Sequence, residues 1–174
     1  MLYGAIEAGG TKFVCAIGDE EMTIKERVSF PTTTPEETMP LVIDFFKQYQ
    51  ADLAGIGIGS FGPIDIHRDS ATYGYITSTP KLAWQNFDFI GTMKKEFPIP
   101  ISWTTDVNAA AYGEYVFGSG KGLSSVVYYT IGTGGGGGAL KKGGKKEKGK
   151  KNKRKKKNKR KKETKTRTRK TREE

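Results

Sequence analysis

The sequence predicts an α/β fold in which one lobe, built on a mixed sheet, is followed by the beginning of a second lobe. Two glycine-rich turns support this prediction, one at residues 7–12 and one at residues 130–138, because strand-like residues precede both of them. Between the turns, short apolar segments alternate with segments whose apolar residues recur at helical spacing, which is typical of α/β proteins.

Three antiparallel strands are predicted at the start of the chain, at residues 2–7, 13–17 and 23–30. Phe13 follows directly on the first turn, and the residues up to Ile17 are rich in β-branched and aromatic types with no helix cap before them. Walker-type and dinucleotide-binding loops both open a helix instead. The first turn is therefore predicted to join two strands of a hairpin.

A helix is predicted over residues 35–49. Thr34 stands at its N-cap, Pro35 at its first position and Glu37 at the capping-box position. Its apolar residues at helical spacing are Leu41, Val42, Phe45 and Phe46. A buried strand at residues 54–58 follows the helix and leads into a loop at residues 59–63.

The second half of the chain begins with a long irregular stretch, residues 64–86, which contains the short motif Ser78-Thr79-Pro80-Lys81. The elements expected after it are a short helix at 88–97, a strand at 101–104, a helix at 106–117, a turn at 118–122 and a strand at 124–131. The last strand leads into the second glycine-rich turn.

Glycine-rich turns of this kind can bind phosphate, because glycine has no Cβ to hold a ligand away and can adopt positive φ. Backbone N–H groups and a threonine hydroxyl can then approach a phosphate oxygen. One such turn alone could equally be an ordinary hairpin without a ligand. Two of them in one chain favour a single nucleotide held between two lobes.

The charge of the chain is concentrated in its last segment. Residues 141–174 hold 21 of the 30 Lys and Arg residues and 4 of the 19 Asp and Glu residues, a net charge of +17, whereas residues 1–140 carry −6. Apart from glycine, the segment consists only of polar and charged residues, so we expect it to be disordered. An evolved basic arm and an artefact, such as a reading-frame or assembly error or a degenerate gene end, are both compatible with it.

Other features favour a cytoplasmic protein. The N-terminus lacks the basic region of a signal peptide, and no apolar stretch approaches the roughly 20 residues of a membrane span. The single cysteine, Cys15, falls in a predicted strand and has no partner for an internal disulfide.

Four motifs carry a resemblance to a known family. They are Glu7-Ala8-Gly9-Gly10-Thr11-Lys12, Gly59-Ser60-Phe61-Gly62-Pro63, Thr105-Asp106-Val107-Asn108-Ala109-Ala110 and Thr130-Ile131-Gly132-Thr133-Gly134. Their order and spacing resemble those of the ROK sugar kinases, which have an actin/hexokinase-like (ribonuclease H-like) fold. The longer strings at residues 5–18 and 79–122 are most similar to bacterial fructokinases of that family.

The resemblance covers residues 1–140, roughly the first half of a family member. It implies an N-terminal actin-like kinase lobe at residues 1–104 and the start of the second lobe at residues 105–140, followed by the basic tail at residues 141–174. It also implies an ATP-dependent kinase that uses Mg²⁺ and converts fructose to fructose 6-phosphate, impaired here by truncation.

Site residues follow from the same resemblance. Asp106 matches the general base that takes the proton of the sugar hydroxyl, and Glu7 matches an acidic residue near the magnesium. The implied ATP-binding residues are Gly9, Gly10, Thr11, Lys12, Thr130, Gly132, Thr133 and Gly134. The residues implied to form or support the sugar pocket are Gly59, Phe61, Gly62, Pro63 and Asn108.

General chemistry agrees with the role given to Asp106. Phosphoryl transfer needs positioned phosphates, a magnesium ion and a base aimed at the nucleophile. A carboxylate at the start of a helix lies beside the positive end of the helix dipole, which favours its ionised form and lets it accept a proton. The alternative is that Asp106 only caps its helix.

The chain also departs from the family pattern. Gly135 stands where family members have an apolar residue, and the family's Cys/His zinc cluster cannot be built from the single His67 and the single Cys15. We expect His67 to be exposed. Two other functions stay open, a sugar-binding fragment without turnover and a nucleic-acid-binding protein that acts through the basic tail. A homodimer, common in the family, is also compatible with the sequence.

A salt titration separates the kinase prediction from nucleic-acid binding. If the tail binds polyanions only through its charge, the affinity should fall by orders of magnitude between about 50 and 200 mM salt, and removal of residues 141–174 should abolish binding. Sequence-selective binding that persists at about 0.2 M salt would favour a nucleic-acid function instead.

Overall fold

The computed structural model describes residues 1–131 and 135–141 of the 174-residue chain. In chain order its elements are β1 (Leu2–Ala8), β2 (Lys12–Asp19), β3 (Ile24–Pro31), α1 (Pro35–Lys47), β4 (Leu53–Ser60), β5 (Tyr75–Ile76), the 3₁₀ helix η1 (Leu82–Trp84), β6 (Phe87–Asp88), α2 (Phe89–Glu96), β7 (Ile101–Thr105), α3 (Asp106–Val116), β8 (Ser125–Ile131) and β9 (Gly135–Lys141). The predicted α/β class is confirmed, and the long elements begin and end within a few residues of their predicted bounds.

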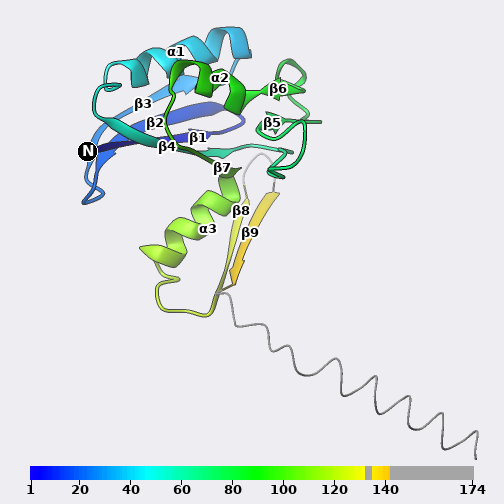
Figure 1. The fold of residues 1–174 in the computed structure, drawn as a ribbon. Coiled ribbons are helices and arrows are strands. Elements are labelled where there is room, and N and C mark those ends of the chain that lie inside the picture. Colours follow the sequence, from blue (N-terminus) through cyan, green and yellow to red (C-terminus); the bar gives the residue numbers. More distant parts are fainter. Residues whose placement is uncertain (132–134, 142–174) are drawn as a thin grey trace, which may run out of the picture. The chain divides into compact units, whose positions relative to one another are not determined.

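The main sheet has five strands in the order β3-β2-β1-β4-β7 (Figure 1). β1 pairs antiparallel with β2 and parallel with β4, so the sheet is mixed as predicted. Side chains of β1 alternate between the two faces: Ile6 and Ala8 are buried, whereas Ala5 and Glu7 are exposed on the opposite face.

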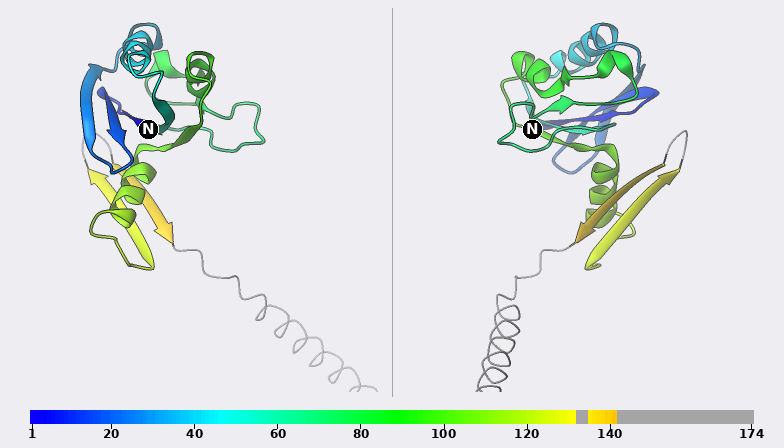
Figure 2. Two further views of the ribbon diagram at one scale, coloured as in Figure 1. Left: turned by 60° about the vertical axis from the view of Figure 1, so that its left-hand side comes forward. Right: turned by 90° about the vertical axis from the view of Figure 1, so that its right-hand side faces the viewer.

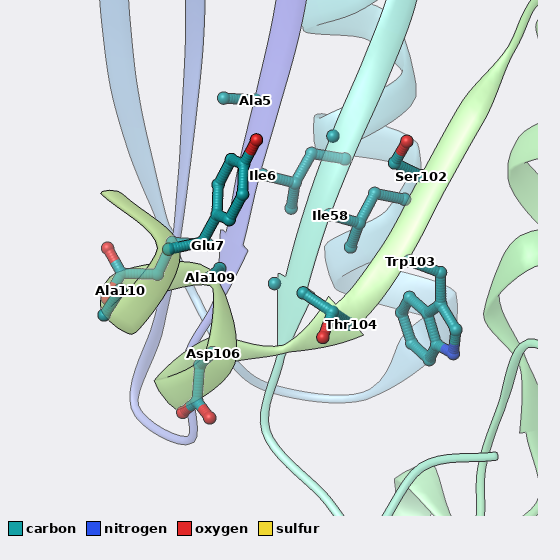
Figure 3. Close-up of a pocket in the computed structure, with 13 residues that line it drawn as sticks. Ala5, Ile6, Glu7, Ile58, Ser102, Trp103, Thr104, Asp106, Ala109 and Ala110 are labelled. Carbon is teal, nitrogen blue, oxygen red and sulfur yellow. The ribbon is translucent and has the colours of Figure 1, made fainter. Parts of the chain in front are cut away.

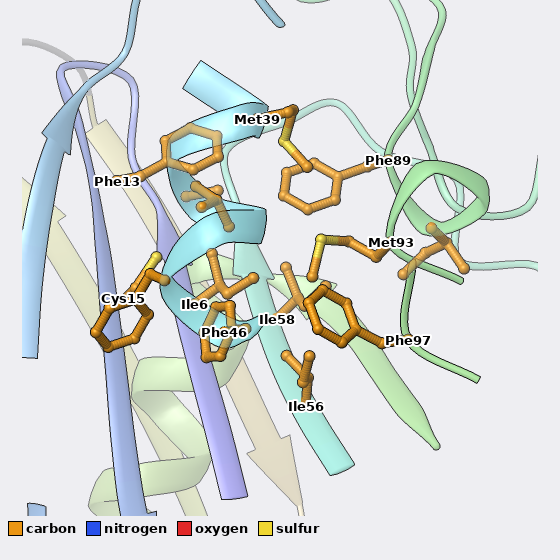
Figure 4. Packing of buried hydrophobic residues seen from close by; sticks show 14 of the residues in the cluster. Ile6, Phe13, Cys15, Met39, Phe46, Ile56, Ile58, Phe89, Met93 and Phe97 are labelled. Carbon is orange, nitrogen blue, oxygen red and sulfur yellow. The ribbon is translucent and has the colours of Figure 1, made fainter. Parts of the chain in front are cut away.

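The hydrophobic core lies on the face of the sheet that α1 and α2 cover (Figures 1 and 2). Phe46 of α1 and Phe97, which follows α2, are both fully buried and pack edge to face with ring centroids 6.3 Å apart. Figure 4 shows these rings among the branched side chains of β1 and β4. On the opposite face of the sheet, α3 lies against β4 and β7.

The stretch expected to be irregular, residues 64–86, contains structure that the sequence did not predict. β5 pairs with β6, and η1 carries Trp84 into the core. The indole N–H of Trp84 donates to the Thr33 carbonyl at 2.8 Å, and its ring lies 5.2 Å from that of Phe13. These contacts are long-range, so no local periodicity indicated them.

The start of α1 differs in detail from the prediction. Thr34 occupies the N-cap and Pro35 the first position, but the Thr34 side chain makes no cap hydrogen bond. The predicted capping box is therefore wrong. Thr38 instead accepts a hydrogen bond from the Thr33 N–H at 3.1 Å and donates one to the Pro31 carbonyl at 3.2 Å, which ties the helix to the end of β3.

The second glycine-rich segment is partly a strand. Residues 135–138 belong to β9, which pairs antiparallel with β8, so the turn does not extend through Gly138 as predicted. A Cβ on Gly138 would lie 2.8 Å from the Val107 carbonyl carbon, because β9 passes very close to the first turn of α3. Lys141, expected in the tail, is the last residue of β9. The predictions for residues 132–134 and 142–174 lie outside the described residues.

Within residues 1–131 and 135–141, no helix is long and apolar enough to cross a membrane.

Replacement of Trp84 tests the packing of η1. Trp84→Ala should lower the free energy of unfolding by about 3–5 kcal/mol, because it removes a fully buried ring from the core. Leu82→Ala is the matched control: Leu82 lies in the same 3₁₀ helix but is 78% exposed, so we expect a change within about 0.5 kcal/mol. Urea unfolding followed by circular dichroism measures both, and equal effects of the two changes would contradict the assignment of η1 to the core.

Candidate active site

Three of the four motifs leave the main sheet at one edge. β1, β4 and β7 are parallel, and their register places Glu7 beside Gly59 and Gly59 beside Thr104. The first glycine turn follows β1, the loop at residues 61–63 follows β4, and α3 follows β7. In open α/β sheets, ligands bind beyond the carboxyl ends of the strands, so this edge is the candidate active site.

The first glycine turn is held in place from β3. The Gly9 N–H donates to the Lys12 carbonyl at 3.0 Å, and the Thr32 hydroxyl donates to the Gly9 carbonyl at 2.7 Å. The Thr32 N–H also donates to the Thr11 carbonyl at 3.0 Å. Gly10, Thr11 and Lys12 are exposed, so the fixed turn is open to a ligand. Sequence reasoning missed Thr32, which follows β3 and gives no local signal of this contact.

Asp106 is the first residue of α3, but it is not the cap of that helix. The N-cap is Thr105, whose hydroxyl accepts a hydrogen bond from the Asn108 N–H at 3.2 Å. Asp106 accepts one hydrogen bond on Oδ1, from the Val107 N–H at 2.8 Å. The N-cap is therefore Thr105, and Asp106 adds a hydrogen bond to the Val107 N–H in the first turn of the helix. Its half-buried carboxylate points beyond the strand ends (Figure 3).

Gly59 determines how closely α3 approaches β4. A Cβ on Gly59 would lie 2.8 Å from the Ala109 Cβ and 3.3 Å from the Asp106 Cα, closer than real Cβ atoms normally come. Only glycine therefore allows the first turn of α3 to lie on the end of β4. The resemblance implied that Gly59 either forms the sugar pocket or supports it, and this geometry favours support.

Contacts with the core and with neighbouring backbone also hold the loop after β4 in place. Phe61 is buried, its ring is 5.8 Å from that of Trp84, and its N–H donates to the Ala8 carbonyl at 2.8 Å. Phe61 therefore packs in the core and is placed to support the pocket. The Gly62–Pro63 peptide bond is cis, and the Pro63 carbonyl accepts hydrogen bonds from the N–H and hydroxyl of Thr77 at 2.8 and 3.1 Å.

A pocket of about 550 Å³ is lined by residues of β1, β4, β7 and α3 (Figure 3). It brings together three of the predicted site residues, Glu7, Gly59 and Asp106, with small residues and with the aromatic side chains of Trp103 and Tyr112. The predicted residues outside its lining are Gly9, Gly10, Thr11, Lys12, Phe61, Gly62, Pro63 and Asn108. Thr130 is exposed on β8, and Gly132, Thr133 and Gly134 lie outside the described residues.

Metal binding was tested against the described side chains. Within residues 1–131 and 135–141, no three His, Cys, Asp or Glu residues lie close enough together to hold a metal ion. His67 is exposed, and Cys15 is buried, which raises the pKa of its thiol to about 12. Mg²⁺ needs only one or two carboxylates when phosphate oxygens supply further ligands, so the exposed carboxylate of Glu7 fits such an ion.

Comparisons with known proteins show which family the sequence resembles. Residues 3–151 match the sequence model of the ROK family. The curated fructokinase of Streptococcus mutans is 61% identical over 142 residues, and the match covers 82% of this chain and 48% of that protein. The putative fructokinase of Bacillus subtilis is 55% identical over 142 residues, and the match covers 82% of this chain and 47% of that protein. The chain spans about half the length of these curated relatives.

A solved structure gives the same result. The ROK family glucokinase of Streptomyces griseus in complex with glucose and AMPPNP superposes with a TM-score of 0.69 at 29% identity, covering 80% of this chain and 44% of that one. The likeness extends to a curated glucokinase of Streptomyces coelicolor, which is 31% identical over 138 residues, with 78% of this chain and 42% of that protein covered.

Two glycines of β4 test the packing under Asp106. Gly59→Ala should lower the free energy of unfolding by about 1–3 kcal/mol, because the added methyl group collides with Ala109 and displaces α3. Gly57→Ala is the matched control, since a Cβ there meets nothing within 4 Å. Denaturant unfolding and amide exchange in α3 measure the effect. Equal stability and equal protection of α3 in both variants would contradict the close contact.

Proposed function

The chain belongs to the ROK family, and on that basis we propose that it carries the nucleotide-binding turn and the general base of an ATP-dependent kinase for fructose. One observation carries the proposal. The first glycine turn and Asp106 both follow the carboxyl ends of parallel strands, β1 and β7, at the same edge of the sheet. Phosphoryl transfer requires such proximity between the phosphate donor and the base that activates the acceptor.

In the proposed reaction, the turn at residues 9–12 presents the backbone N–H groups of Gly10 and Thr11 and the Thr11 hydroxyl to the ATP phosphates. Mg²⁺, when bound near Glu7, would spread the phosphate charge. The acceptor hydroxyl of the sugar attacks the γ-phosphorus, and the bond from that phosphorus to the β–γ bridging oxygen breaks, which releases ADP. Asp106 takes the proton of the hydroxyl.

The geometry around Asp106 suits this role. Thr105 supplies the N-cap, and Asp106 accepts the Val107 N–H through Oδ1, so Oδ2 is the oxygen that would take the proton of the sugar hydroxyl. Gly59 fixes the height of α3 above the sheet, and this fixes the Asp106 backbone. We propose that Gly62, Pro63 and Asn108 lie nearest the sugar, with Phe61 holding their loop from the core.

Fructose is the proposed acceptor because identity to curated fructokinases, 61% and 55%, far exceeds the 31% identity to a curated glucokinase. We further propose the division into a first lobe at residues 1–104 and the start of a second at residues 105–140, with the nucleotide between Gly9–Lys12 and Thr130–Gly134. ATP as donor makes a cytoplasmic location the natural one.

A chimera tests the proposed base. Residues 1–141 of this chain would replace the matching segment of the Streptococcus mutans fructokinase, and the product should transfer phosphate from ATP to fructose. Asp106→Asn in the chimera should lower kcat by about 10²–10⁴, because a general base is lost, and should leave the affinity for ATP unchanged.

The control for this experiment is Asp44→Asn, which removes an exposed carboxylate from α1 and should leave kcat unchanged. An unchanged kcat in Asp106→Asn would refute the role of Asp106. A folded chimera that binds ATP but phosphorylates glucose and not fructose would refute the proposed substrate.

A further inference from the structure

We propose that Lys81 is an additional phosphate-binding residue, whose ammonium group contacts a phosphoryl oxygen of a nucleotide bound at the first glycine turn. The inference rests on the proposed function, because it requires that the turn at residues 9–12 bind phosphate. What it adds is a cation from a segment remote in sequence, the Ser78-Thr79-Pro80-Lys81 motif, which none of the roles above uses.

The side chain of Lys81 lies against the turn. A Cβ built on Gly10 would be 3.5 Å from the Lys81 Cε, an ordinary van der Waals distance, and the ammonium nitrogen is one bond beyond that carbon. Gly10 and Thr11 are exposed and Lys81 is half-buried. The end of the lysine side chain therefore lies beside backbone that is open to a ligand.

The backbone that carries Lys81 is firmly held. The Lys81 N–H donates to the hydroxyl of Thr79 at 3.3 Å, and Thr79 is only 1% exposed. The Lys81 carbonyl accepts a hydrogen bond from the Trp84 N–H at 2.8 Å, and Trp84 is fixed in the core through Thr33. A side chain attached to such a fixed backbone loses less conformational freedom when it binds a ligand.

No carboxylate neutralises Lys81 in the described part of the chain. The ion pairs within residues 1–131 and 135–141 join the N-terminal ammonium to Glu20, Lys25 to Asp19, and Lys47 to Glu96. A lysine beside backbone N–H groups, with a second lysine at Lys12, forms a strongly anion-attracting surface. A phosphate chain fits that surface, because it carries several negatively charged oxygens.

Lysine labelling with residue resolution tests the proposal on the full 174-residue chain. The basic tail binds anions as well, so total binding does not report on this site, and about 0.2 M salt is used to weaken tail binding. With Mg²⁺-AMPPNP at about ten times its dissociation constant, labelling of Lys81 and Lys12 should slow about tenfold by mass action. Lys94, exposed on α2, should label at the same rate with and without ligand.

The possible outcomes separate this inference from the proposed function. Protection of Lys12 without protection of Lys81 would overturn the assignment of Lys81 and leave the phosphate-binding turn intact. Protection of neither lysine would overturn both proposals.

Three substitutions supply a second measurement. Lys81→Met should raise the AMPPNP concentration that half-protects Lys12 by about tenfold, because a charged hydrogen bond to phosphate is lost. Lys81→Arg keeps the charge and should stay within about threefold of the unchanged chain. Lys94→Met is the control and should have no effect. Thermal unfolding should be the same for all three variants, and equal half-protection in Lys81→Met and the unchanged chain would overturn the inference.

Discussion

The close contact between α3 and the end of β4 is the constraint on which the site depends. At Gly59 the helix comes so near to the strand that any side chain would collide with Ala109. This contact fixes Asp106 beyond the end of β7, at the same end of the sheet as the turn that follows β1. Because β1, β4 and β7 run parallel, one short edge of the sheet carries the first glycine turn, the loop at residues 61–63 and Asp106.

The one-sided core explains why that edge is rigid. Apolar side chains of α1, α2 and η1 fill the face of the sheet opposite the pocket, and Trp84 joins this core to the loop after β4 and to Thr33. Contacts with the core thus hold the segments around the site in place, while the surfaces of these segments that face away from the core stay exposed. Such an arrangement holds binding groups in place without ordering them at the moment of binding.

Much of this could be predicted from the sequence because the signals are local. Strand residues around the first turn and Pro35 at the start of α1 indicated those elements correctly. The error at Gly138 involves long-range packing, because this glycine suggested a turn but lies in a strand that packs on Val107. The contact between Phe61 and Trp84 is also long-range, and no local pattern indicated it. The approach of Lys81 to Gly10 likewise depends on the tertiary path of residues 64–86, which no sequence pattern encodes.

We propose that the first glycine turn and the start of α3 form one nucleotide-binding edge. Paramagnetic broadening by Mn²⁺-AMPPNP tests it most directly, because broadening falls steeply with distance from the metal. We expect the amide signals of Gly10, Thr11 and Val107 to broaden together at about 0.2 M salt, where tail binding is weakened. The amide signals of Lys94 and Lys95 on α2 should stay sharp. Broadening at Gly10 without broadening at Val107, or broadening confined to residues 142–174, would contradict it.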